Sequence, residues 1–216
     1  MTRILSGAFC ALIILSALFL PGCSSLDVTH KLAPDFESAA PVKVAVLGAA
    51  WQDKEDETAN DGARVGGLIS DLAQDKAMSL GYSTVRAEGK AHDAKRALDA
   101  EQYAQTARSL SVDAVLVPII AGWERSAHIA GYVSFAFEAS FTLISADGRV
   151  LWSASFKAEE SDMPVPMSVR SDSEALEISI HKAYEARLQR YVDAAFATLP
   201  PMSAHARPRT HYDWLP

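Results

Sequence analysis

The sequence predicts an α/β protein with a single domain, a sandwich on a mixed sheet of about five strands. Between residues 42 and 120, short apolar runs alternate with stretches whose apolar residues recur at helical spacing, the order β-α-β-α-β of crossover units. After residue 132 the period changes to strict alternation, which is typical of an antiparallel hairpin. A long helical stripe follows. The predicted order is therefore β-α-β-α-β, a hairpin and a C-terminal helix.

The first β-α-β unit is predicted over residues 42–85. Residues 42–49 are an apolar run that ends in small residues, as expected for a strand buried on both faces. Asp61 can cap the next helix, and Gly81 ends it. The apolar positions of that helix are Val65, Leu68, Ile69, Leu72 and Leu80. Residues 82–85 then form the second strand.

The next helix and strand carry two local signals. Asp99 is followed three residues later by Gln102, the spacing of a helix-capping box. Residues 114–120 form an almost wholly apolar strand that contains Pro118. Since proline has no N–H to give to a sheet, we expect a bulge or an unpaired stretch there.

The hairpin covers residues 132–156, with its turn at Ala146-Asp147-Gly148. Ser173 caps the closing helix, whose stripe ends at Leu199. One face of the first hairpin strand is apolar: Phe135, Phe137, Ala139, Phe141 and Leu143. Pro200-Pro201 stops the helix.

The first 22 residues predict a secretion signal. Arg3 gives a positive start, an apolar run extends to Leu20, and small residues lead to Cys23. The sequence Leu20-Pro21-Gly22-Cys23 resembles the lipobox of bacterial lipoproteins, although the usual pattern has Ala or Ser where Pro21 stands. This resemblance implies that cleavage leaves Cys23 as the first residue, carrying diacylglyceryl and N-acyl groups. An ordinary cleaved signal is the alternative.

The expected organisation follows from this anchor. Residues 1–22 are the signal, residues 23–41 hold the lipidated cysteine and a flexible tether, residues 42–199 form the domain, and residues 200–216 are a mobile tail. Two or more acyl chains hold a protein stably in a membrane. By resemblance to enteric sorting, Ser24 after the cysteine favours the periplasmic face of the outer membrane over inner-membrane retention.

Charge and cysteine content limit the partners. After signal removal, 19 Lys and Arg face 27 Asp and Glu, a formal charge of −8. So acidic a chain argues against nucleic acid as a partner. Cys10 leaves with the signal and Cys23 carries lipid, so the mature chain forms no internal disulfide.

Three segments of the domain carry a resemblance to a known family. They are Lys43-Val44-Ala45-Val46-Leu47, Val112-Asp113-Ala114-Val115-Leu116-Val117 and Asp147-Gly148-Arg149-Val150-Leu151-Trp152. With these segments, residues 42–199 resemble the α/β domain of envelope lipoproteins of the CsgG and LpoB kind, and the TolB amino-terminal domain. The resemblance implies a role in an envelope complex, or, as an alternative, a subunit of a CsgG-like secretion pore.

The sequence offers no catalytic motif. It contains no Gly-x-Ser-x-Gly and no His-Glu-x-x-His, and the glycines at 48, 62, 66 and 67 do not form a phosphate-binding loop. We therefore expect no enzymatic activity and no cofactor. The acidic residues at 53–61 match a calcium loop poorly, because Leu68 stands where a bidentate Glu belongs. Glu174, Glu177 and His181 share a helix face, but such faces are common, so no metal is expected.

Trp51 and Trp123 are the candidate partner-binding residues. Each follows the carboxyl end of a predicted parallel strand, so on neighbouring strands both indoles reach one rim, where open α/β sheets bind ligands. Glu124 and Arg125 would add polar contacts. The alternative is that the rings pack over the end of the core.

The sequence thus favours a lipid-anchored protein of the outer membrane that faces the periplasm. Its expected role is binding, assembly or regulation in a cell-envelope complex. Its expected partners are the membrane and an unidentified envelope protein, and self-association stays open. Tethering would act by raising the local concentration of the domain near its partner.

Overall fold

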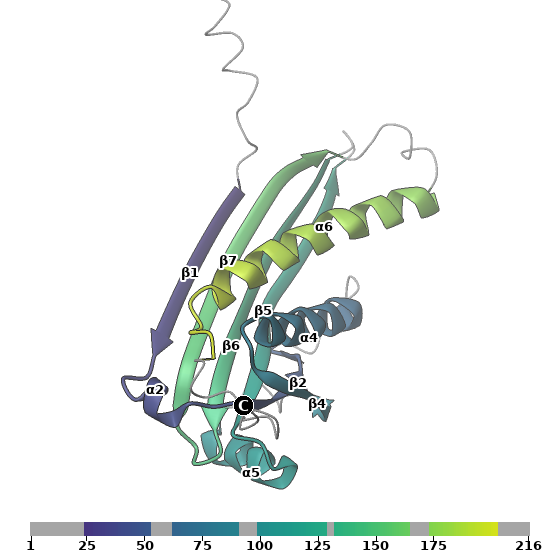
Figure 1. The fold of residues 1–216 in the computed structure, drawn as a ribbon. Coiled ribbons are helices and arrows are strands. Elements are labelled where there is room, and N and C mark those ends of the chain that lie inside the picture. Colours follow the sequence, from purple (N-terminus) through teal and green to yellow (C-terminus); the bar gives the residue numbers. More distant parts are fainter. Residues whose placement is uncertain (1–23, 53–61, 91–98, 129–131, 165–172, 203–216) are drawn as a thin grey trace, which may run out of the picture.

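A computed structural model describes residues 24–52, 62–90, 99–128, 132–164 and 173–202, which form one mixed sheet with helices on both faces (Figure 1). The strands are β1 (Ser24–Leu32), β2 (Lys43–Gly48), β3 (Ala50–Trp51), β4 (Ser83–Lys90), β5 (Ala114–His128), β6 (Tyr132–Ser145) and β7 (Val150–Pro164). The helices are α2 (Phe36–Ala39), α4 (Gly62–Ser79), α5 (Ala100–Leu110) and α6 (Ser173–Phe196).

The sheet has the strand order β1-β7-β6-β5-β2-β4, and β3 also pairs with β5. The pairings of β2 with β4 and of β5 with β2 and β3 are parallel, whereas β1, β6 and β7 join by antiparallel pairings. The predicted α/β class with a mixed sheet is confirmed. The described residues form seven strands rather than about five, because β1 and β3 were not expected.

Local signals in the parallel half act as predicted. The Asp99 carboxylate accepts a hydrogen bond of 3.3 Å from the Gln102 backbone N–H and so caps α5. Gly81 adopts φ +95° just after α4, a conformation that favours glycine. The predicted cap Asp61 lies outside the described residues.

Pro118 lies where β5 changes its parallel partner. On that side β5 pairs with β2 through Leu116 and with β3 from Ile119, so the expected unpaired stretch is present. On the other side the pairing with β6 runs unbroken through Pro118 and Phe141, and the bulge falls between Ile120 and Gly122.

The hairpin of β6 and β7 is confirmed, with Gly148 at φ +84° in its turn. Its strands are longer than expected, since β7 reaches Pro164 rather than ending at residue 156. β5 likewise continues to His128, because β6 offers it a partner along that whole length. The apolar face of β6 is buried at every second residue, as predicted.

The predicted flexible tether is wrong over residues 24–32. These residues form β1, which pairs with β7 from Ser24 opposite Glu160 to Leu32 opposite Trp152. The short helix α2 follows, and its Phe36 is buried. The sheet therefore begins one residue after Cys23. At the other end of the domain, the tail expected to be mobile lies outside the described residues from 203 onward.

The helices cover the sheet unequally. α4 and α6 pack on one face, over the larger core, and α5 packs on the other face beside β2 and β5 (Figure 1). α6 crosses the long antiparallel strands. Aromatic rings fill the space beneath it: Trp123, Phe135, Phe137, Phe141, Trp152, Phe156, Tyr184, Tyr191 and Phe196.

Glu160 is a buried carboxylate within this aromatic layer, at 6% exposure. It accepts hydrogen bonds from the Arg190 guanidinium and the Tyr191 hydroxyl, and Arg187 Nε lies 3.5 Å from its second oxygen. Burial raises the pKa of Tyr191, and the hydrogen bond to Glu160 raises it further, so the hydroxyl keeps its proton. This cluster ties β7 to α6.

Replacing Glu160 by glutamine is predicted to destabilise the domain. The change removes a charge that two arginines and a tyrosine surround, and hydrogen bonds to charged groups contribute about 1.5–3 kcal/mol each before allowance for the partly exposed arginines. We expect a loss of about 1–3 kcal/mol in the free energy of unfolding, measured by urea titration. Glu159→Gln is the matched control, because Glu159 points to the other face and pairs with Lys157 in solvent. Equal effects of the two changes would contradict the structural role of Glu160.

Candidate functional site

The predicted lipid-attachment residue, Cys23, lies outside the described residues. The structure places its neighbour Ser24 at the start of β1, on the free edge of the sheet. A lipid on Cys23 would therefore be joined to a strand with nine paired positions. No described helix is long and apolar enough to cross a membrane.

Trp51 is buried at 5% exposure at the end of β3, on the α4 side of the sheet. Its ring lies against Gly66 of α4, where an added Cβ would come within 3.2 Å of the indole nitrogen. Glycine at this position therefore allows the helix to approach the ring. Sequence reasoning did not pair these two residues, although a glycine inside a helical pattern often has a packing reason.

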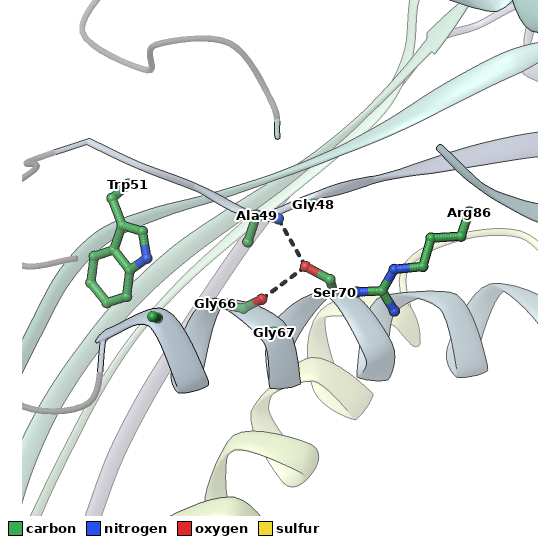
Figure 2. Close-up of a pocket in the computed structure, with 8 residues that line it drawn as sticks. Gly48, Ala49, Trp51, Gly66, Gly67, Ser70 and Arg86 are labelled. Atoms are coloured by element: carbon green, nitrogen blue, oxygen red, sulfur yellow. Dashed lines mark hydrogen bonds between the residues drawn. The ribbon is translucent and has the colours of Figure 1, made fainter. Parts of the chain in front are cut away.

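A cavity of about 210 Å³ lies between the carboxyl end of β2, the ring of Trp51 and the first half of α4 (Figure 2). Its walls are mainly small residues, among them Gly48, Ala49 and Gly67. Ser70 closes one side, where its hydroxyl donates to the Gly66 carbonyl and accepts from the Ala49 N–H, each at 2.8 Å.

Arg86 of β4 also lines the cavity, at the end opposite Trp51 (Figure 2). Its side chain is about half exposed and forms an ion pair with Asp71 of α4. The parallel pairing of Val46 with Arg86 puts this side chain on the α4 face of the sheet. Sequence reasoning missed Arg86, because the predicted strand ended at residue 85.

Trp123 lies within β5 rather than after its end, and it is 3% exposed. Its ring packs against Phe135, Phe137 and Tyr184, at centroid distances of 5.6, 5.7 and 5.2 Å. Trp51 belongs to the same buried core. The prediction that both indoles are accessible at one rim of the sheet is therefore wrong. The alternative, that the rings pack on the core, is confirmed.

The two charged candidates beside Trp123 point to opposite faces of β5. Glu124 is exposed, whereas Arg125 lies on the α6 side and its guanidinium is 3.2 Å from the carboxylate of Glu177. Glu177 is also one of the residues considered for a metal, and its backbone carbonyl lies 2.6 Å from His181 Nδ1. These contacts join β5 to α6.

Within the described ranges, no cluster of three or more His, Cys, Asp or Glu side chains is placed to hold a metal ion. The acidic stretch at residues 53–61 falls outside those ranges.

No protein-family model matches the chain. This comparison therefore gives no support to the predicted resemblance to lipoproteins of the CsgG and LpoB kind. No curated protein matches the chain either. Solved structures similar to this chain include three bacterial proteins. The PelC dodecamer of Paraburkholderia phytofirmans is 17% identical, with 78% of this chain and 95% of that chain covered, at a TM-score of 0.46.

Lipoprotein GNA1162 of Neisseria meningitidis is 18% identical, with 68% of this chain and 98% of that chain covered, at a TM-score of 0.41. A DUF4136 family protein of Bacteroides thetaiotaomicron is 8% identical, with 77% and 97% covered, at 0.31. All three TM-scores are below 0.5, so no inference about this chain rests on these likenesses.

Alanine at the two adjacent glycines of α4 is predicted to have different effects. At Gly67 an added Cβ meets nothing within 4 Å, so Gly67→Ala should stabilise the domain by about 0.5–1 kcal/mol through helix propensity. Gly66→Ala should gain less than this or lose stability, because its Cβ presses on the Trp51 ring. Thermal unfolding of the two variants measures the difference. Equal stabilisation would show that Trp51 does not pack as described.

Proposed function

We propose that the chain is a bacterial cell-envelope lipoprotein, anchored through Cys23 at the periplasmic face of the outer membrane. It acts by binding rather than by catalysis, as an assembly or regulatory factor for an envelope complex. The observation that supports this proposal best is the position of β1, which begins directly after the predicted lipid-attachment residue and is the edge strand of the sheet. The lipobox-like sequence supplies the anchor.

A lipid joined to β1 without a tether fixes the orientation of the domain. Ser24 marks the end of the sheet nearest the membrane, and the hairpin turn at Ser145 and Val150 marks the opposite end, beside α5 (Figure 1). At about 3.4 Å per residue, the nine residues of β1 span roughly 30 Å. The α5 end of the domain would then face the periplasm and be presented to a partner.

The alternative of a secretion-pore subunit has less support. A strand that crosses a membrane needs an apolar face toward lipid. The apolar face of β6 is covered by α6, and its other face carries Ser140 and Glu138. β6 therefore has no apolar face left open for lipid, and we keep the binding role as the proposal.

Lipid attachment is tested by Cys23→Ser in a Gram-negative host. The unchanged protein should incorporate a labelled fatty acid and fractionate with the outer membrane, because acylation needs the Cys23 thiol. Cys23→Ser should incorporate none and lose its membrane association. Cys10→Ser is the matched control and should behave like the unchanged protein, since Cys10 lies in the signal. Absence of label on the unchanged protein would remove the proposal.

Orientation on the membrane is a separate prediction. A dye on the single cysteine of a Leu26→Cys variant should be quenched strongly by spin-labelled lipid headgroups, and a dye on Val150→Cys weakly. Both side chains are exposed, and along β7 their positions are about 27 Å apart by strand rise.

The lipidated Cys23 does not react with the dye, so each variant carries one label. A 15-residue Gly/Ser linker placed before Ser24 is the control, and it should weaken quenching at Leu26→Cys because flexible chain then separates lipid and strand. Equal quenching at both positions without the linker would contradict a direct connection.

A further inference from the structure

The cavity beside Trp51 is lined by a hydrogen-bond donor, the indole N–H of that residue. The indole N–H of Trp51 has no hydrogen-bond partner among the described residues, although its ring is 95% buried. In Figure 2 the edge of the ring that carries the nitrogen points toward Ala49 and Gly66, which also line the cavity. Indole N–H groups normally find an acceptor when the ring is buried. The Trp51 N–H opens on the cavity, so an acceptor oxygen bound there can satisfy it.

The other polar groups of the cavity differ in what they can offer. The Ser70 hydroxyl already donates and accepts within the protein, so it has little left for a ligand. The Arg86 guanidinium has five N–H groups, and its ion pair with Asp71 uses one nitrogen, Nη1. Arg86 can therefore bind an acceptor at the mouth of the cavity while it keeps its ion pair.

The electrostatics of the cavity favour a negative ligand. Its walls include Ala63, in the first turn of the 18-residue helix α4, where the helix dipole contributes a positive potential. None of the described residues that line it is Asp or Glu. Donors at both ends and small apolar residues between them match a short molecule with acceptor oxygens at its two ends.

We propose that this cavity is a binding site for a small organic anion of the short-chain dicarboxylate type. One carboxylate accepts from Arg86 at the mouth, the other accepts from the Trp51 N–H inside, and the carbon chain lies against Ala49 and the glycines of α4. The volume of about 210 Å³ admits four or five carbons and excludes a drug-sized ligand. The site does not depend on Cys23, so this inference stands apart from the proposed anchoring.

Titration of the purified mature lipoprotein in detergent with succinate and with glutarate tests the proposal. We expect saturable binding by calorimetry together with a change in tryptophan emission. Succinamide, which has the same length without charge, should bind at least tenfold more weakly. No saturation by either dicarboxylate up to about 10 mM, or equal binding of succinamide, would overturn the proposal.

Two variants assign the binding to this cavity. Trp51→Phe keeps most of the ring and removes the N–H, and it should weaken binding about tenfold and abolish the emission change. Arg86→Gln should also weaken binding about tenfold or more. Arg64→Gln is the matched control, because Arg64 also projects from this region but pairs with Glu185 of α6, outside the cavity.

The variants are compared by circular dichroism and thermal unfolding, so that a loss of fold is separated from a loss of ligand contacts. If Trp51→Phe and Arg86→Gln fold normally and bind succinate as the unchanged protein does, the ligand lies elsewhere and the assignment is wrong. If Arg64→Gln weakens binding as much as Arg86→Gln, the effect is one of general charge and the assignment is equally wrong.

Discussion

The aromatic layer between α6 and the long antiparallel strands is the contact on which the rest of the structure depends. Rings from β5, β6 and β7 meet Tyr184, Tyr191 and Phe196 of α6 at centroid distances between 5.1 and 6.3 Å. Each ring buries about 150–250 Å², and each pair adds about 0.5–1.5 kcal/mol beyond that burial. This layer covers the one apolar face of the strands. It also surrounds Glu160, whose three partners fix the position of α6 along β7.

The way α6 and α4 divide one face of the sheet explains why the cavity lies beside Trp51. α6 covers the antiparallel strands and α4 covers β2, and the small residues Gly66 and Gly67 leave space where α4 meets the sheet. One row of paired residues crosses the sheet from β3 to β1: Trp51, Ile120, Ala139, Phe156 and Val28. The cavity is therefore only about four strand residues, or roughly 14 Å, farther along the sheet than Ser24. On an anchored protein, it would lie near the membrane.

Much of the fold could be predicted because its signals are local. The hairpin, the α5 cap and the end of α4 depend on residues within a few positions of one another, such as Asp99 with Gln102. β1 could not be predicted in this way. Leu26 and Val28 do alternate with polar residues, but the run is short and polar, and its partner β7 is more than a hundred residues away. An edge strand is determined by that distant partner.

The candidate site shows the same limit. The sequence correctly placed Trp51 at the carboxyl end of a parallel strand, whereas Trp123 lies within the longer β5, and the accessibility of both rings depends on what covers them. α6 covers Trp123 because it crosses β5 at that level, and α4 approaches Trp51 because residue 66 is glycine. Neither fact follows from the strand pattern. Arg86 was missed because β4 continues beyond its apolar residues.

A lipid anchor on Cys23, as proposed, would have a mechanical consequence. If a partner pulled the far end of the domain away from the membrane, the load would run along β1, and its nine residue pairs with β7 would resist together in shear. A sideways pull instead opens the pairs one after another, starting with Ser24 and Glu160. That first pair is the one whose β7 residue is held to α6 by Arg190 and Tyr191. The Glu160 contacts thus hold β7 against α6 at the point where peeling would begin.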